Sequence, residues 1–298
     1  MFRLFGLMIF PFFVGCGFWS PMTEYTLAVF SDDDQGAAAV WQNFEGQDTI
    51  THLKKREIQV QVWLSRDNPS GTLEAFSEMQ PGYEVDLFFM REAGYVILGR
   101  LVESEEPEEA ADPSAVSATL FYDQIDLDGN TQEIARLKYF PFGDGDCGSG
   151  PQPLRVIPNA DGSQLAKFEV TLSETCDDLQ AQLLFLDATN LEALGDAIAV
   201  EGLFTAGSAI RGFQFSLGWT SDGGFAVAGE GDQSLPANIY RLNAEPELGV
   251  TLDRNCFHPP TTSSETNSNG QYLGVDSESG ELEVSDESEP GHGFGCES

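Results

Sequence analysis

The 298-residue sequence is poor in basic residues, histidine and cysteine, and it lacks a long apolar run. It has 14 Lys and Arg against 49 Asp and Glu, which gives a formal net charge of −35 at pH 7. A field of that sign repels nucleic-acid phosphates and anionic lipid headgroups, so we expect no nucleic-acid partner and no adsorption to lipid by charge. Hydrophobic residues still make up 41% of the chain, which is enough for a sizeable core.

The sequence contains no motif that nominates a catalytic residue. There is no GxSxG nucleophile turn, no HExxH metal motif and no P-loop. The GxGxxG pattern at 143–148 places two aspartates where a pyrophosphate would bind, and Ser-Gly-Pro follows where a helix must begin. A histidine general base needs a partner carboxylate, and nothing in the sequence nominates one for His52, His258 or His292. No residue is therefore assigned a catalytic role, and we favour a non-catalytic protein over an enzyme.

The N-terminus has the pattern of an export signal. Arg3 precedes an apolar stretch at 4–14, which is too short to span a bilayer and is typical of a secretory signal peptide at 1–15. The stretch Phe13-Val14-Gly15-Cys16 resembles the lipobox of bacterial lipoproteins. That resemblance implies that Cys16 is lipidated and becomes the first residue of the mature chain, followed by a linker at 16–24. Gly17 stands where inner-membrane lipoproteins have Asp, which implies anchoring to the outer membrane of a bacterial cell envelope.

Four cysteines remain once Cys16 is assigned to lipid: Cys147, Cys176, Cys256 and Cys296. An even number in an exported chain predicts two disulfides, with three pairings possible. We favour the sequential pairing, Cys147–Cys176 and Cys256–Cys296, in which the second bond would hold the C-terminal tail at 286–298. A zinc site is disfavoured because no CxxC spacing occurs.

A turn pattern recurs through the middle of the chain. Each copy is a polar cluster, a glycine and then an apolar run; the glycines are Gly36, Gly94, Gly162, Gly223 and Gly270, 47 to 68 residues apart. Glycine suits such turns because tight hairpins need positive φ. A second hairpin follows most copies of the turn pattern, and two hairpins in one repeat predict a unit of four strands. These hairpins pair 60–64 with 71–76, 119–125 with 131–137, 183–187 with 193–200, and 239–242 with 247–252.

Repeated four-stranded units predict an all-β fold, a β-propeller of about five blades at 25–285. The turns at 158–163 and 220–226 resemble the S-P-D-G-x blade turn of TolB-like and WD40-like β-propellers, although the Pro of that motif and the paired Trp-Asp are missing. β-Sandwich domains are the alternative, because they also consist of many short strands.

One acidic turn is a candidate metal site. Asp123, Asp126 and Asp128 crowd the segment before Asn130, and carboxylates are the ligands that Ca²⁺ prefers. The spacing fails the EF-hand pattern, because Ala135 stands where the bidentate Glu belongs. We favour a hairpin turn here and expect no cofactor, with Ca²⁺ as the alternative.

These features together predict a lipid-anchored envelope protein that binds a protein partner or acts as a scaffold. The first alternative is a propeller-type metal-dependent hydrolase or lactonase with carboxylates converging on one axis. The second is a glycan-binding module, which needs exposed aromatic side chains on a rim. Trp41, Trp63 and Trp219 fall on predicted strands, so we expect them in the core instead. The acidity itself fits either adaptation to high salt or loose binding of divalent cations.

Overall fold

A computed structural model describes most of the central part of the chain. The described residues are 22–44, 56–65, 72–73, 77–103, 116–142, 154–172, 179–200, 216–220, 222–228, 234–253, 272–275 and 282–285. In these ranges the regular structure is entirely β, as predicted. They contain no helix of the length and hydropathy needed to cross a membrane.

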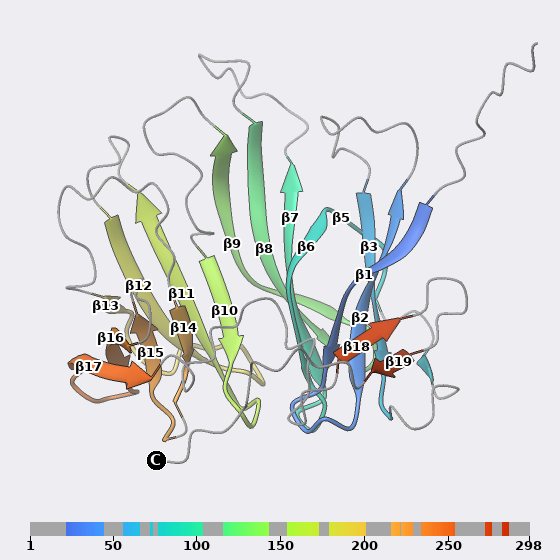
Figure 1. Ribbon diagram of the computed structural model, residues 1–298. Helices are drawn as coiled ribbons and strands as arrows, with labels where there is room; N and C mark the ends of the chain where they lie inside the picture. The colour runs from blue at the N-terminus through green and yellow to red at the C-terminus, as the bar shows by residue number, and fades with distance from the viewer. Residues whose placement is uncertain are drawn as a thin grey trace, which may run out of the picture.

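The strands form a series of antiparallel sheets in chain order (Figure 1). Each sheet is built from strands that are consecutive in sequence, so the chain runs up and down within one sheet before it enters the next. Sheet 1 contains β1 (Met22–Phe30), β2 (Ala37–Phe44), β3 (Arg56–Trp63), β4 (Thr72–Leu73) and β5 (Gln80–Pro81), with both β4 and β5 paired to β3. Sheet 2 contains β6 (Tyr83–Met90), β7 (Tyr95–Glu103), β8 (Val116–Asp126) and β9 (Thr131–Phe142).

The later sheets repeat this order. Sheet 3 contains β10 (Leu154–Pro158), β11 (Gln164–Leu172), β12 (Leu179–Asp187) and β13 (Ile198–Val200). Sheet 4 contains β14 (Ser216–Trp219), β15 (Phe225–Ala228), β16 (Ser234–Tyr240) and β17 (Glu247–Asp253). Sheet 5 has two described strands, β18 (Tyr272–Val275) and β19 (Leu282–Ser285).

Sheets 1 to 4 pack in chain order, and first strands lie at the contacts of sheet 1 with sheet 2 and of sheet 2 with sheet 3. β1 packs against β6, β10 packs against β6, and a parallel bridge joins Ser31 at the end of β1 to Phe89 in β6. β18 lies against β1, so the last sheet returns to the first (Figure 1). Separate hydrophobic clusters fill the spaces between sheets 1 and 2, sheets 2 and 3, and sheets 3 and 4.

Some strands lack alternation of apolar and polar residues because both faces of their sheet are buried. Residues 37–40 of β2 and 225–228 of β15 are all buried, because each strand lies inside a sheet that is covered on both sides. Such strands read as continuous apolar runs, and their alanines allow close approach of the neighbouring sheet.

The predicted hairpins are confirmed for β8–β9, β12–β13 and β16–β17, and the first is confirmed in part by the pairing of Val62 with Leu73. Gly94, Gly162 and Gly223 have the positive φ that the turn pattern requires. The prediction was wrong at Gly36: in that turn the positive φ belongs to Asp34, at 59°. Gly270 lies outside the described residues.

Several sequence predictions concern residues that the structure does not describe. They are the signal peptide at 1–15, the lipidation site Cys16, the tail at 286–298 and the four cysteines Cys147, Cys176, Cys256 and Cys296. The same holds for the three histidines. β1 begins at Met22, so the last part of the segment 16–24 lies in a strand.

Candidate functional site

The loops at one end of the sheets form a candidate binding surface, which we name the turn face. In an up-and-down sheet, the loop after the first strand and the loop after the third strand lie at the same end. In Figure 1 the β1–β2, β6–β7 and β10–β11 turns point together toward the lower edge. The turn face consists of residues 31–36, 91–94, 127–130, 159–163, 188–197, 220, 222–224 and 241–246.

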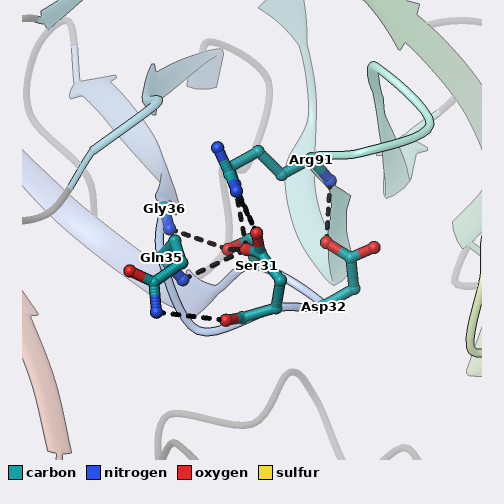
Figure 2. Close-up of polar contacts among 6 residues, drawn as sticks. Ser31, Asp32, Gln35, Gly36 and Arg91 are labelled. Atoms are coloured by element: carbon teal, nitrogen blue, oxygen red, sulfur yellow. Dashed lines mark hydrogen bonds and ion pairs between the residues drawn. The ribbon is translucent and has the colours of Figure 1, made fainter.

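The β1–β2 turn is closed by its own polar side chains (Figure 2). The backbone N–H of Asp34 donates to the carbonyl of Ser31 at 3.0 Å, and the N–H of Gly36 donates to Ser31 Oγ at 2.8 Å. Ser31 Oγ in turn donates to Asp33 Oδ1 at 2.6 Å. Short polar side chains favour turns because they bond to the backbone within a few residues. The turn thus holds the Asp33 carboxylate in one orientation.

Arg91, in the β6–β7 turn, binds this carboxylate from the neighbouring sheet. Its Nε lies 2.9 Å from Asp33 Oδ1 and 2.7 Å from Oδ2, and its Nη2 also contacts Oδ2. The backbone N–H of Arg91 donates to Asp32 Oδ1 at 2.9 Å (Figure 2). The two turns are therefore joined by both side-chain and backbone bonds.

The pKa values of Asp33 and Asp32 are shifted in opposite directions. The hydrogen bonds and positive charge of Arg91 hold the pKa of Asp33 well below its usual range. Partial burial raises the pKa of Asp32, more than its hydrogen bond from the Arg91 N–H lowers it. Asp33 is thus an ion-pair partner across the junction, whereas Asp32 is an exposed carboxylate at its edge.

The same turn is built twice more along the chain. The backbone N–H of Gly162 donates to the carbonyl of Asn159, and that of Gly223 donates to the carbonyl of Thr220, both at 3.0 Å. Each turn has an aspartate one residue before its glycine: Asp161 accepts from Ser163 Oγ, and Asp222 accepts from Thr220 Oγ1, both at 2.6 Å. These hydrogen bonds lower the pKa of both carboxyls. The turns thus resemble one another in sequence because they share a backbone hydrogen bond and an aspartate held by a hydroxyl donor.

The turn face is strongly acidic. In the described turns the basic residues are Arg91 and Arg241, and both are ion-paired, Arg241 with Asp222 at 2.5 Å and with Glu247. Many carboxylates in or beside these turns are exposed to solvent. They are Asp32, Glu92, Asp128, Asp161, Glu192, Asp196, Asp222, Glu245 and Glu247.

The structure separates the three carboxylates that the sequence grouped as metal candidates. Asp123 is buried on β8 and pairs with Arg100 at 2.7 Å. Asp126 closes the β8–β9 hairpin by accepting from the N–H groups of Asp128 and Asn130, both at 2.9 Å. Asp128 is exposed. Over the described ranges, no three His, Cys, Asp or Glu side chains come together as a possible metal site.

Sequence reasoning missed Asp86 on β6, the most deeply buried carboxyl group among the residues that the structure describes. Its Oδ2 accepts from Tyr122 Oη on β8 and from Arg155 Nη1 on β10, so it joins sheets 2 and 3. The available signal was a single aspartate inside the apolar β6 sequence YEVDLFFM. A charged residue within a strand buried on both faces calls for a partner, but its identity depends on residues far away in sequence.

Of the three tryptophans within the described residues, one fills the core and one joins two sheets. Trp63 is 1% exposed, which confirms the prediction of a core residue. Trp219 is half-buried, packs against Phe185 and Phe225, and donates through Nε1 to the Ile157 carbonyl of sheet 3 at 3.1 Å. Trp41 is half-buried on β2.

The Asp33–Arg91 pair gives a prediction for the turn face. A double-mutant cycle with D33N and R91M is expected to give a coupling of about 1 kcal/mol at pH 7, because the pair is partly exposed to water. Since the folded pKa of Asp33 is lowered, this stabilisation is fully present above the ordinary value of 3.8 and is lost as the pH falls through the lowered pKa. Urea unfolding of the four proteins at pH 7 and pH 3 measures it. A coupling that grows in acid would contradict the assignment.

Comparisons with known proteins return no family. No protein-family model matches the sequence, and no curated protein matches it. Among solved structures, the chain is similar to the acylaminoacyl peptidase of Pyrococcus horikoshii, with 9% identity, a TM-score of 0.45, and coverage of 85% of this chain and 35% of that chain. It is also similar to Zg3597, a family 117 glycoside hydrolase of Zobellia galactanivorans, with 12% identity, a TM-score of 0.35, and coverage of 78% and 76%. The chain spans about a third of the length of the peptidase, and we take no activity from either protein.

Proposed function

We propose that this chain is an exported lipoprotein, anchored through Cys16 to the outer membrane of a bacterial envelope, that acts as a non-catalytic binding or scaffolding module. In this proposal the five sheets are the blades of a β-propeller. The order of the sheets supports it, because each is a meander of consecutive strands, β1 and β10 both pack on β6, and β18 lies against β1.

The observation that carries the binding function is the repeated turn. Asp33, Asp161 and Asp222 occupy the same place in three turns and are each held by a hydroxyl donor. A surface made of such turns keeps its shape without a partner, so little ordering is lost on binding. Its exposed carboxylates favour an envelope protein with a basic surface, which the negative field would steer toward the turn face.

The buried Trp63 counts against the glycan-binding alternative, which needs exposed aromatic rings, whereas Trp219 and Trp41 are half-buried and do not count against it.

In-cell photo-cross-linking tests the binding proposal. A photo-reactive amino acid replaces Glu92 or Glu245, both exposed on the turn face, and in the control it replaces Glu57, exposed at the start of β3 and at the other end of its sheet. We expect one reproducible protein adduct from the two turn positions and none from position 57. Background alone at all three positions, or the same adducts from position 57, would contradict it.

A separate experiment tests the anchor. The C16S variant is expected to lose metabolic labelling by an alkyne fatty acid and to leave the outer-membrane fraction. Labelling that persists in C16S would overturn the lipoprotein assignment and leave the binding proposal to the cross-linking result.

A further inference from the structure

The junction between sheets 2 and 3 contains a carboxyl group that is almost fully removed from water. Asp86 is 1% exposed. Its Oδ2 accepts two hydrogen bonds, from the Tyr122 hydroxyl and from the Arg155 guanidinium. Its Oδ1 is equally buried and has no hydrogen-bond partner. A buried oxygen of an ionised carboxylate without a donor is costly, so this half of the group needs an explanation.

The backbone is arranged to place Asp86 there. Glu84 pairs with Arg100 and Asp86 pairs with Gly99, so the extra residue Val85 forms a bulge that turns Glu84 and Asp86 to opposite faces of sheet 2. Gly99 lies between Asp86 and Tyr122 in the sheet and lets the two side chains meet above it. A Cβ at position 99 would lie 3.1 Å from Asp86 Cβ and 3.0 Å from Tyr122 Cε1.

Few other charges act on Asp86. On β10 the charged residue is Arg155, whose side chain is 25% exposed and reaches from sheet 3 to the carboxylate. On β7 and β8, Arg100 and Asp123 pair with each other near Pro81, on the face toward sheet 1. Besides Tyr122, two tyrosines share the face toward sheet 3 with Asp86: Tyr83 on β6, opposite Leu101, and Tyr95 on β7, which donates to the Gly162 carbonyl at 2.8 Å. The electrostatic partners of Asp86 are thus one cation and one phenol.

We propose that Asp86 is a proton-binding site that couples the packing of sheets 2 and 3 to pH. Hydronium transfers a proton to the unpartnered Oδ1: one O–H bond of hydronium breaks, one O–H bond forms on Oδ1, water is released and no protein bond breaks. The Tyr122 and Arg155 bonds to Oδ2 remain available in both states. Protonation removes the charge that the buried site disfavours, so the closed junction holds a proton that an opened, hydrated junction releases.

The direction of the pKa agrees with this geometry. Burial raises the pKa of Asp86 above 3.8 more than the positive charge of Arg155 and the two hydrogen bonds lower it. Burial also raises the pKa of Tyr122 far above its usual range, so Tyr122 stays a donor throughout. A group with a raised folded pKa stabilises the closed state at low pH, and the contribution is lost as the pH rises through the folded pKa.

Amide hydrogen exchange of the mature protein tests the proposal. D86N keeps the shape of the side chain and an oxygen acceptor but does not titrate. After correction for intrinsic exchange rates, we expect the opening equilibrium of β6 and β10 in the wild type, relative to D86N, to rise between pH 3 and pH 8, by about tenfold for each pH unit by which the folded pKa of Asp86 exceeds 3.8. Exchange in β16 and β17, away from this junction, is the internal reference.

The D33N variant is a control of opposite sign, because the pKa of Asp33 is lowered. The proposal would be overturned if the opening equilibrium of β6 and β10 in the wild type, divided by that in D86N, did not change with pH or fell as the pH rises. If D86N does not fold, infrared titration of ¹³C-aspartate-labelled D32N/D123N protein decides it, because these substitutions remove the other two described aspartates with a raised pKa. An aspartate band that titrates above the ordinary 3.8 supports the proposal, and titration of all aspartate bands at or below that value refutes it.

Discussion

Replacing Arg155 by methionine is expected to destabilise the protein by about 3 kcal/mol at pH 8, because it leaves a buried carboxylate without its cation. Asp86 would then keep only the Tyr122 hydrogen bond to Oδ2, since Oδ1 has no partner. Methionine preserves most of the apolar stem of Arg155, so the loss reports the charge and not a cavity.

The loss in free energy of unfolding caused by R155M is expected to be smaller at pH 5 than at pH 8. Without Arg155 the carboxyl of Asp86 is still more easily protonated, and the neutral acid does not need a counter-charge. Urea unfolding at the two pH values measures both quantities.

R136M is the matched control for R155M. Arg136 also pairs with a carboxylate, Glu133 at 2.8 Å, but the two side chains are 66% and 38% exposed. Exposed pairs of this kind contribute little, so R136M is expected to change stability by less than about 0.5 kcal/mol at either pH. Equal losses in R155M and R136M would show that Asp86 does not depend on Arg155.

The sequence predicted local pairings well and long-range ones poorly. The β8–β9 hairpin follows from alternating strands around Asp128-Gly129, and the φ of 85° at Gly129 is what such a turn needs. Trp63 was correctly placed in the core because a large apolar residue on a strand has few other places to lie.

The ion pairs between sheets could not be predicted in the same way. Asp33 and Arg91 are 58 residues apart, and Asp86 and Arg155 are 69 apart. Their meeting depends on how two separately formed sheets pack, which no local pattern encodes. The bulge at Val85 decides which face of sheet 2 Asp86 occupies, and a regular strand would have placed Asp86 on the same face as Glu84.

Gly36 shows how a correct residue can be selected for the wrong reason. It was assigned to the turn for its backbone freedom, yet the positive φ is at Asp34. What requires glycine at position 36 is close packing. A Cβ there would lie 2.8 Å from the Trp63 carbonyl oxygen, 2.9 Å from Phe89 Cε1 and 2.9 Å from Arg91 Cδ.

The G36A variant is therefore expected to be destabilised by about 2 kcal/mol, through overpacking at the junction of sheets 1 and 2. The Trp63 carbonyl belongs to a residue of β3 paired with Ala37, and Phe89 is buried, so neither yields easily. Arg91 is the neighbour with room to move, and its movement would break the contact of its guanidinium with Asp33. Stability and the Asp33–Arg91 coupling should fall together.

G195A separates this steric effect from a general cost of adding a methyl group. Gly195 is exposed, and a Cβ there would meet Leu242 Cδ1 at 3.4 Å, a contact with a flexible side chain. The free energy of unfolding of G195A, measured in urea, is expected to lie within about 0.5 kcal/mol of the wild-type value. If G36A were as stable as G195A, the turn would tolerate a side chain and the Asp33–Arg91 junction would not depend on Gly36. If G36A alone is destabilised and its coupling energy disappears, the glycine is what lets the arginine of one sheet reach the aspartate of the other.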